Sequence, residues 1–210
     1  ADVWGAGSDW DDLLFNPMVD LSLDLGGGFS ALIGTWWDVN DNADSSIANA
    51  VQEVDVWAGI AYATGDWSLS LIYQDWMYAS QSERIVDLNI GYSHFLNPSL
   101  TLHARVDHDL GPTIDNGLAV VLGIAPGMDA GPVALSFPVK IAAETDEFHG
   151  GDSGFSFASA GVGASLPLEF MRGDWSLDAG LTLYHTNDDV IPNNPDDFFL
   201  TGSLGLKLKF

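Results

Sequence analysis

The sequence predicts an all-β protein, an antiparallel transmembrane β-barrel of about twelve strands that forms one domain over residues 1–210. Apolar and polar residues alternate with a period of two in many segments, as they do in strands with one apolar face. No apolar run approaches the ~18 residues that a transmembrane helix needs. Short and long connections also alternate along the chain, which is typical of barrels that cross a membrane.

About twelve extended segments lie between clusters of turn residues. They cover residues 1–8, 16–25, 28–38, 51–63, 66–77, 84–95, 99–107, 116–124, 132–143, 154–167, 174–184 and 198–210. None carries the i, i+3, i+4 spacing of an amphipathic helix. The segments therefore favour strands throughout the chain.

The connections between these segments predict which end of the barrel each loop occupies. Short or moderate turns lie at 26–27, 64–65, 96–98, 125–131 and 168–173. Longer polar connections lie at 8–15, 39–50, 78–83, 108–115, 144–153 and 185–197. This alternation places both termini at the short-turn end, which would face the periplasm in an outer-membrane barrel.

Charge follows the same division. Of the 30 acidic residues, about 18 fall in the longer loops and their edges. Most charged strand residues lie on the polar face, which we expect to line the interior; Asp75 is the exception. The predicted pore-lining residues are Asp20, Asp24, Asp55, Asp87, His103, Arg105, Asp107, Lys140, Asp178, Lys207 and Lys209.

The last strand carries a distinctive pattern. One face of residues 202–210 consists of Leu204, Leu206, Leu208 and Phe210. Lipid suits such an apolar face better than water does, although an ordinary strand of a soluble β-protein is the alternative. The pattern resembles the C-terminal assembly signal of bacterial outer-membrane barrels. The resemblance implies recognition by the barrel-assembly machinery.

The composition excludes several functions. The formal net charge is −24, with six basic residues, so the chain should repel nucleic acid. The eight Trp, eleven Phe and five Tyr contradict disorder. Cysteine is absent, which excludes disulfides and thiolate metal sites. Aromatic residues gather near strand ends, as in the interfacial girdles of membrane barrels.

Longer stretches point to a family. These are VDLSLDLGGGFSALIGTWWD at 19–38, EVDVWAGIAYATGDWSLSLIYQDWMY at 53–78, FLNPSLTLHARVDHD at 95–109, and ALSFPVKI, GFSFASAGVGASLPL and GDWSLDAG within 134–180. In this order they resemble the TorF-type porin family of bacterial outer-membrane β-barrels. The resemblance implies an exported barrel in contact with outer-membrane lipid. The sequence begins Ala-Asp-Val without Met, as a chain does after its signal peptide is removed.

No catalytic constellation stands out. The five histidines show no spacing that selects a Ser–His pair, so we expect no enzyme, no cofactor and no metal site. His103, Arg105 and Asp107 fall on one face of one predicted strand, either as a charged constriction or as a salt-bridge ladder. The acidic loops could bind Ca²⁺, but none fits the spacing of an EF-hand, and solvated loops are the simpler interpretation.

Three functional hypotheses follow. The first is a narrow channel for small solutes or ions, with weak cation preference because acidic mouths concentrate cations. The second is a closed structural or adhesive barrel that contacts other proteins of the envelope. The third is a soluble acidic barrel that binds a small ligand. The sequence leaves the solute and the oligomeric state open.

Overall fold

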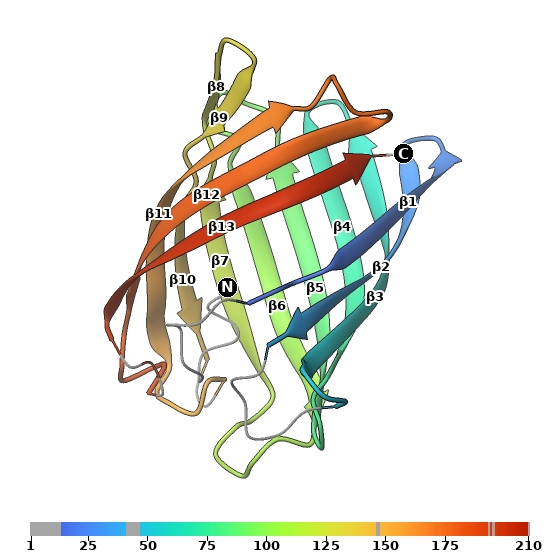
Figure 1. The fold of residues 1–210 in the computed structure, drawn as a ribbon. Coiled ribbons are helices and arrows are strands. Elements are labelled where there is room, and N and C mark those ends of the chain that lie inside the picture. The colour runs from blue at the N-terminus through green and yellow to red at the C-terminus, as the bar shows by residue number, and fades with distance from the viewer. Residues whose placement is uncertain (1–13, 41–46, 146–147, 193, 195, 210) are drawn as a thin grey trace.

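The computed structural model describes residues 14–40, 47–145, 148–192, 194 and 196–209. They form one antiparallel sheet of thirteen strands that curls around a central space (Figure 1). The strands are β1 (Met18–Gly26), β2 (Phe29–Val39), β3 (Val51–Thr64), β4 (Trp67–Met77), β5 (Ser82–Tyr92), β6 (Ser99–His108), β7 (Gly117–Ile124), β8 (Gly127–Ala130), β9 (Val133–Ser136), β10 (Val139–Glu144), β11 (Gly154–Pro167), β12 (Asp174–Thr186) and β13 (Phe198–Lys209). The described residues contain no helix, and so none that could cross a membrane.

Antiparallel pairing joins the strands in the order β1-β2-β3-β4-β5-β6-β7-β10-β11-β12-β13, and β8 and β9 lie off this path. The prediction of an all-β antiparallel sheet is therefore confirmed. Among the described residues, β1 pairs only with β2, and β13 only with β12. The predicted first strand, residues 1–8, lies outside the described residues.

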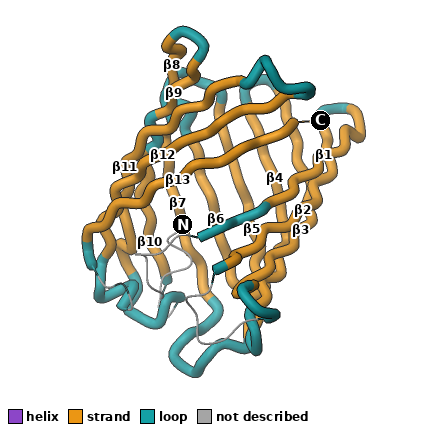
Figure 2. Tube along the Cα trace, in the orientation of Figure 1, coloured by secondary structure: helices purple, strands orange, loops and turns teal. Residues whose placement is uncertain are grey.

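Turns and loops divide between the two ends of the sheet (Figure 2). The β1–β2 turn uses Gly27 and Gly28, with φ of 63° and 86°. Positive φ at both central positions is the type I′ requirement, which glycine meets without steric cost. The C-terminus lies at the same end as this turn, which we call the short-turn end; the opposite end is the long-loop end.

The structure corrects the predicted segment 132–143 and the turn 125–131. Two short strands, β8 and β9, form a hairpin here, and β9 also pairs with β11. The two-residue turn between β8 and β9 consists of Gly131, with φ of 65°, and Pro132. Pro138 then separates β9 from β10, since proline has no N–H to donate to a ladder. The hairpin projects beyond the rim at the short-turn end (Figure 1).

A close contact between neighbouring strands involves Gly34. The Trp57 indole crosses Gly34 and donates from Nε1 to Asp20 Oδ1 at 3.2 Å. A Cβ at Gly34 would lie 2.3 Å from that indole. We expect Gly34→Ala to lower the free energy of unfolding by about 1–3 kcal/mol, because the ring must move and loses its hydrogen bond. Gly205→Ala is the matched control, since its Cβ would have no atom within 4 Å. Equal urea midpoints for the two variants would contradict this contact.

Candidate functional site: the concave face of the sheet

Alternation assigns one set of side chains to the concave face, and strand pairing carries this assignment from strand to strand. Asp87 pairs with His103, and His103 pairs with Ala119. All of the predicted lining residues except Asp107 share this face: Asp20, Asp24, Asp55, Asp87, His103, Arg105, Lys140, Asp178, Lys207 and Lys209. That these residues line a pore remains a prediction.

The structure corrects the position of Asp107. A bulge at Val106 shifts the register, so Arg105 pairs with Ile85 while Asp107 pairs with Arg84. An extra residue in one strand turns the following side chain to the opposite face. Asp107 therefore lies on the convex face, 2.7 Å from the Arg84 guanidinium.

Asp75, the exception to the predicted charge pattern, also lies on the convex face. It pairs with Arg84 in the β4–β5 ladder, and its Oδ1 lies 4.0 Å from Arg84 Nε. The predicted ladder of His103, Arg105 and Asp107 is thus divided between two faces. His103 and Arg105 remain inside, and Asp107 joins Arg84 and Asp75 outside.

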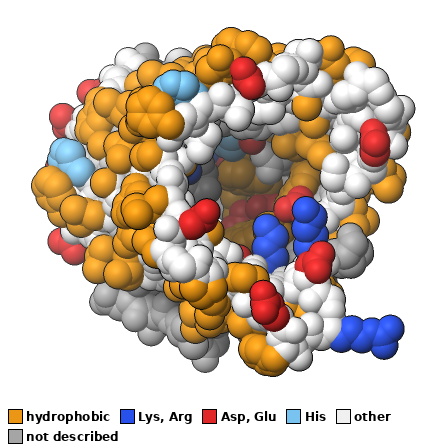
Figure 3. All heavy atoms as spheres, turned by 90° about the horizontal axis from the view of Figure 1, so that it is seen from above, with side chains coloured by type: hydrophobic (Ala, Val, Ile, Leu, Met, Phe, Trp, Pro, Cys, Tyr) orange, Lys and Arg blue, Asp and Glu red, His pale blue; other side chains and the backbone are white. Residues whose placement is uncertain are grey.

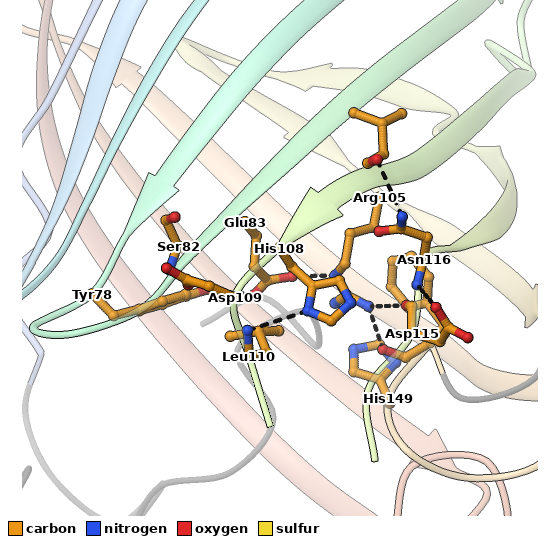
Figure 4. Close-up of polar contacts among 12 residues, drawn as sticks. Tyr78, Ser82, Glu83, Arg105, His108, Asp109, Leu110, Asp115, Asn116 and His149 are labelled. Carbon is orange, nitrogen blue, oxygen red and sulfur yellow. Dashed lines mark hydrogen bonds and ion pairs between the residues drawn. The ribbon is translucent and has the colours of Figure 1, made fainter. Parts of the chain in front are cut away.

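Arg105 is the centre of a buried network near the long-loop end (Figure 4). Its Nε donates to Glu83 Oε2 at 2.5 Å, and Glu83 is 5% exposed. Its NH1 donates to the carbonyl oxygens of Phe148, at 2.6 Å, and Asp115, at 3.2 Å. One guanidinium thereby joins β5, β6 and two connections at the long-loop end.

Phe148 brings an aromatic ring from the β10–β11 connection into the interior. The ring is 1% exposed, and the Arg105 guanidinium carbon lies 4.2 Å from its centroid. An Arg over an aromatic face is attracted by the ring quadrupole. The same ring meets His103 edge-on, with centroids 5.8 Å apart. Phe148 therefore fills space that would otherwise remain beside Arg105.

A chain of hydrogen bonds continues from His103 toward β4. His103 Nδ1 lies 2.6 Å from Asp87 Oδ1, and Gln74 donates to Asp87 Oδ2 at 2.6 Å. Trp76 in turn donates to Gln74 Oε1 at 3.2 Å. Asp87 thus has partners for both carboxylate oxygens, as a partly buried carboxylate requires.

Tyr78 holds the other oxygen of Glu83, with its hydroxyl donating to Oε1 at 2.7 Å. Burial, together with the nearby carboxylates of Glu53 and Glu83, raises the pKa of Tyr78. The phenol therefore stays protonated and remains a donor. Glu83 is consequently fixed between a guanidinium and a hydroxyl.

Apolar side chains fill the interior beside the later strands. Val121, Ala142 and Phe157 project inward from β7, β10 and β11. Val190 and Ile191 from the β12–β13 connection pack against them and are 3% and 1% exposed. Residues from two long connections therefore occupy the interior near the long-loop end.

The other half of the concave face carries small side chains and is hollow. The inward residues of this half are mainly Gly, Ser, Thr and Ala, among them Gly59, Ala61, Ser70, Thr101, Gly123, Gly163, Gly180, Ser203 and Gly205. Viewed from the short-turn end, the molecule has a central hollow in which basic and acidic side chains lie close together (Figure 3). This hollow opens at the short-turn end.

The convex face is apolar and exposed along most of the sheet. On β13, Leu204 is 76% exposed and Leu206 is 57% exposed, and Leu208 shares their face. Phe210, the fourth residue of the predicted assembly signal, lies outside the described residues. Further exposed apolar residues on other strands include Val19, Leu21, Leu23, Ile33, Ile60, Leu71, Leu122, Ile141 and Leu181.

The histidines occupy separate environments. His149 Nδ1 lies 2.6 Å from Glu144 Oε2, whereas His185 stacks on Phe198 at 4.3 Å on the convex face. His108 Nδ1 accepts a hydrogen bond from the Leu110 backbone. Within the described ranges, no group of three or more His, Asp or Glu side chains is arranged to hold a metal ion.

Sequence reasoning missed Glu83 and Phe148, the two residues that Arg105 contacts most closely. Glu83 lies in the predicted connection 78–83, because Arg84 and Ile85 interrupt the alternation that marks the rest of β5 as a strand. Phe148 carries no signal either, because a loop aromatic has no strand register.

Comparison with known protein families and with curated proteins finds no match to this chain.

Proposed function

We propose that the protein is an outer-membrane β-barrel that forms a narrow channel for small solutes or ions, with its wide mouth at the short-turn end. The observation that carries this proposal is the division between the two faces of the curled sheet. Its convex face exposes leucine, isoleucine and valine from strand after strand, and its concave face carries most of the charged strand residues. Lipid outside and water inside would satisfy this arrangement.

The directions of the two edge strands support closure by one more strand. β1 and β13 both run from the long-loop end to the short-turn end, since ten antiparallel pairings separate them in the sheet order. Direct pairing between them would be parallel, whereas an intervening antiparallel strand would give an even number around the barrel. We propose that one further antiparallel strand closes the barrel between β13 and β1.

The location of the protein and its partners belong to the same proposal. The outward leucines of β13 suit recognition by the barrel-assembly machinery, and the convex face suits outer-membrane lipid. The resemblance to TorF-type porins supports the same assignment. A barrel of about twelve strands lies between filled eight-stranded barrels and open ones of 16 to 18 strands, so any channel should be narrow.

The second candidate is a closed structural or adhesive barrel. The buried contacts of Arg105 with Glu83 and Phe148 favour it, because they fill the interior on one side of the long-loop end. A barrel filled across its whole section would insert into a membrane without conducting.

Single-channel recording of refolded protein in a planar lipid bilayer distinguishes the two candidates. We expect small discrete conductance steps, and a reversal potential in a salt gradient that indicates weak cation preference, because the chain carries a net charge of −24. The protein could instead require detergent and shift in electrophoretic mobility on heating, as a folded barrel does, but show no conductance. That result would contradict the channel and favour the closed structural barrel. A protein soluble without detergent would overturn both.

A further inference from the structure

A pocket with both charged and apolar lining lies at the short-turn end where β11, β12 and β13 meet. Its volume is about 440 Å³, and its charged lining residues are Glu169, Asp174, Asp178, Lys207 and Lys209, beside Ser165, Leu168 and Trp175. We call it the rim pocket. Ligand pockets for small molecules commonly span ~300–1,000 Å³, so the rim pocket is large enough for a small solute.

The acidic side of the rim pocket centres on Asp178. Ser165 faces Asp178 in the β11–β12 ladder and donates from Oγ to Asp178 Oδ1 at 2.5 Å. On the opposite side Asp178 faces Gly205, where an added Cβ would meet nothing within 4 Å. The serine fixes the carboxylate, and the glycine leaves room beside it.

The basic side consists of Lys207 and Lys209, which follow Gly205 along β13. They pair with Ser176 and Asp174 of β12 and share the concave face with Asp178. Within the described part of the chain, no ion pair within 4.0 Å involves either lysine. Both ammonium groups are therefore available to a ligand, although acidic residues outnumber basic ones five to one in this chain.

We propose that the rim pocket binds small zwitterions, namely free amino acids or short peptides. The ammonium group of the ligand lies against Asp178, and its carboxylate lies against Lys207 and Lys209. A simple anion would meet the carboxylates of Glu169, Asp174 and Asp178 in the same pocket, and a simple cation would meet the lysines. A zwitterion matches both signs of charge at once. The inference deepens the proposed channel function by naming its solute class.

The test uses four related probes on the full chain folded in detergent micelles, with binding followed by calorimetry. The probes are glycylglycine, N-acetylglycylglycine, glycylglycinamide and N-acetylglycylglycinamide, which differ only in which charges remain. We expect glycylglycine to bind best and each single block to weaken binding by about tenfold, since each removes one charge-assisted hydrogen-bonding group. The doubly blocked peptide should bind weakest.

Two variants assign the two sides of the pocket. Asp178→Asn should abolish the preference for a free amine over its N-acetyl form and keep the preference for a free carboxylate. The double variant Lys207→Gln/Lys209→Gln should do the reverse. Asp129→Asn, on β8 at the same end but outside the pocket lining, is the control and should leave all four affinities unchanged.

Several results would overturn the inference. Equal or tighter binding of N-acetylglycylglycine would show a simple anion site. Equal binding of all four probes would show that charge plays no part in recognition. No binding by the folded protein would show that the rim pocket is not a site for zwitterions. Binding by a protein that does not conduct would contradict the channel function and support the zwitterion site. Conduction without binding would support the channel function and contradict the zwitterion site.

Discussion

Replacing Arg105 with glutamine is expected to lower the free energy of unfolding by about 3–5 kcal/mol, the cost of leaving a buried charge without its partner. Glu83 is 5% exposed, and its Oε2 accepts its hydrogen bond from Arg105. The Phe148 carbonyl would lose its donor, and its ring would lose the guanidinium above it. Urea unfolding of the protein folded in lipid vesicles, followed by tryptophan fluorescence, measures the change.

Two controls separate this cost from a loss of positive charge as such. Lys140→Gln removes the same charge from the same face, but Lys140 forms no ion pair within the described residues, so we expect a change within about 0.5 kcal/mol. The double variant Glu83→Gln/Arg105→Gln removes both charges and should recover much of the lost stability, because neither partner is left uncompensated. Equal losses for Arg105→Gln and Lys140→Gln would contradict the buried pair.

The same variant bears on the choice between channel and closed barrel. If the contacts of Arg105 with Phe148 narrow the conducting path, Arg105→Gln should give larger conductance steps than the unaltered protein. Unchanged steps would place the narrowest part of the path elsewhere.

Alternation alone predicted which face most strand residues occupy. In β1, Asp20 and Asp24 lie on one face and Leu21 and Leu23 on the other, as the period of two requires. The same holds for β13, where Lys207 and Lys209 share the concave face. Such assignments need no knowledge of neighbouring strands, because each strand carries its own pattern.

Alternation does not predict two features of the fold, because both depend on how a strand pairs with its neighbouring strands. The bulge at Val106 turns Asp107 outward, yet the sequence around it alternates as a regular strand would. The β8–β9 hairpin lies in a stretch rich in glycine and proline, residues that mark turns, although the prolines flank short strands here. A strand's partner, rather than its own pattern, decides both outcomes.

The candidate site was also predictable only in part. The strand pattern predicted that Arg105 and His103 share one face, but it did not predict the side chains that surround them. Phe148 approaches Arg105 from 43 residues away in the sequence. No local pattern encodes a contact at that separation, so the filling of the interior could not be derived from the sequence.

Leu71→Arg tests the assumption on which the proposed function rests, that lipid covers the convex face. Leu71 lies in the middle of β4, pairs with Ile60 and Leu88, and is 51% exposed. In a bilayer an arginine at this depth should lower the free energy of unfolding by about 2–4 kcal/mol. In water the same change would be nearly neutral, since surface substitutions usually stay within about 0.5 kcal/mol.

The control is an apolar residue that is even more exposed but lies outside the strands. Phe170, in the β11–β12 turn, is 84% exposed, and Phe170→Arg should cost only about 0–1 kcal/mol, since charges near the membrane interface are tolerated. Urea unfolding of both variants in lipid vesicles gives the comparison. A large loss for Leu71→Arg alone would mean that the exposed leucines face hydrocarbon. Equal small losses of unfolding free energy in the two variants would mean that lipid does not cover the convex face. That result would contradict the proposed channel.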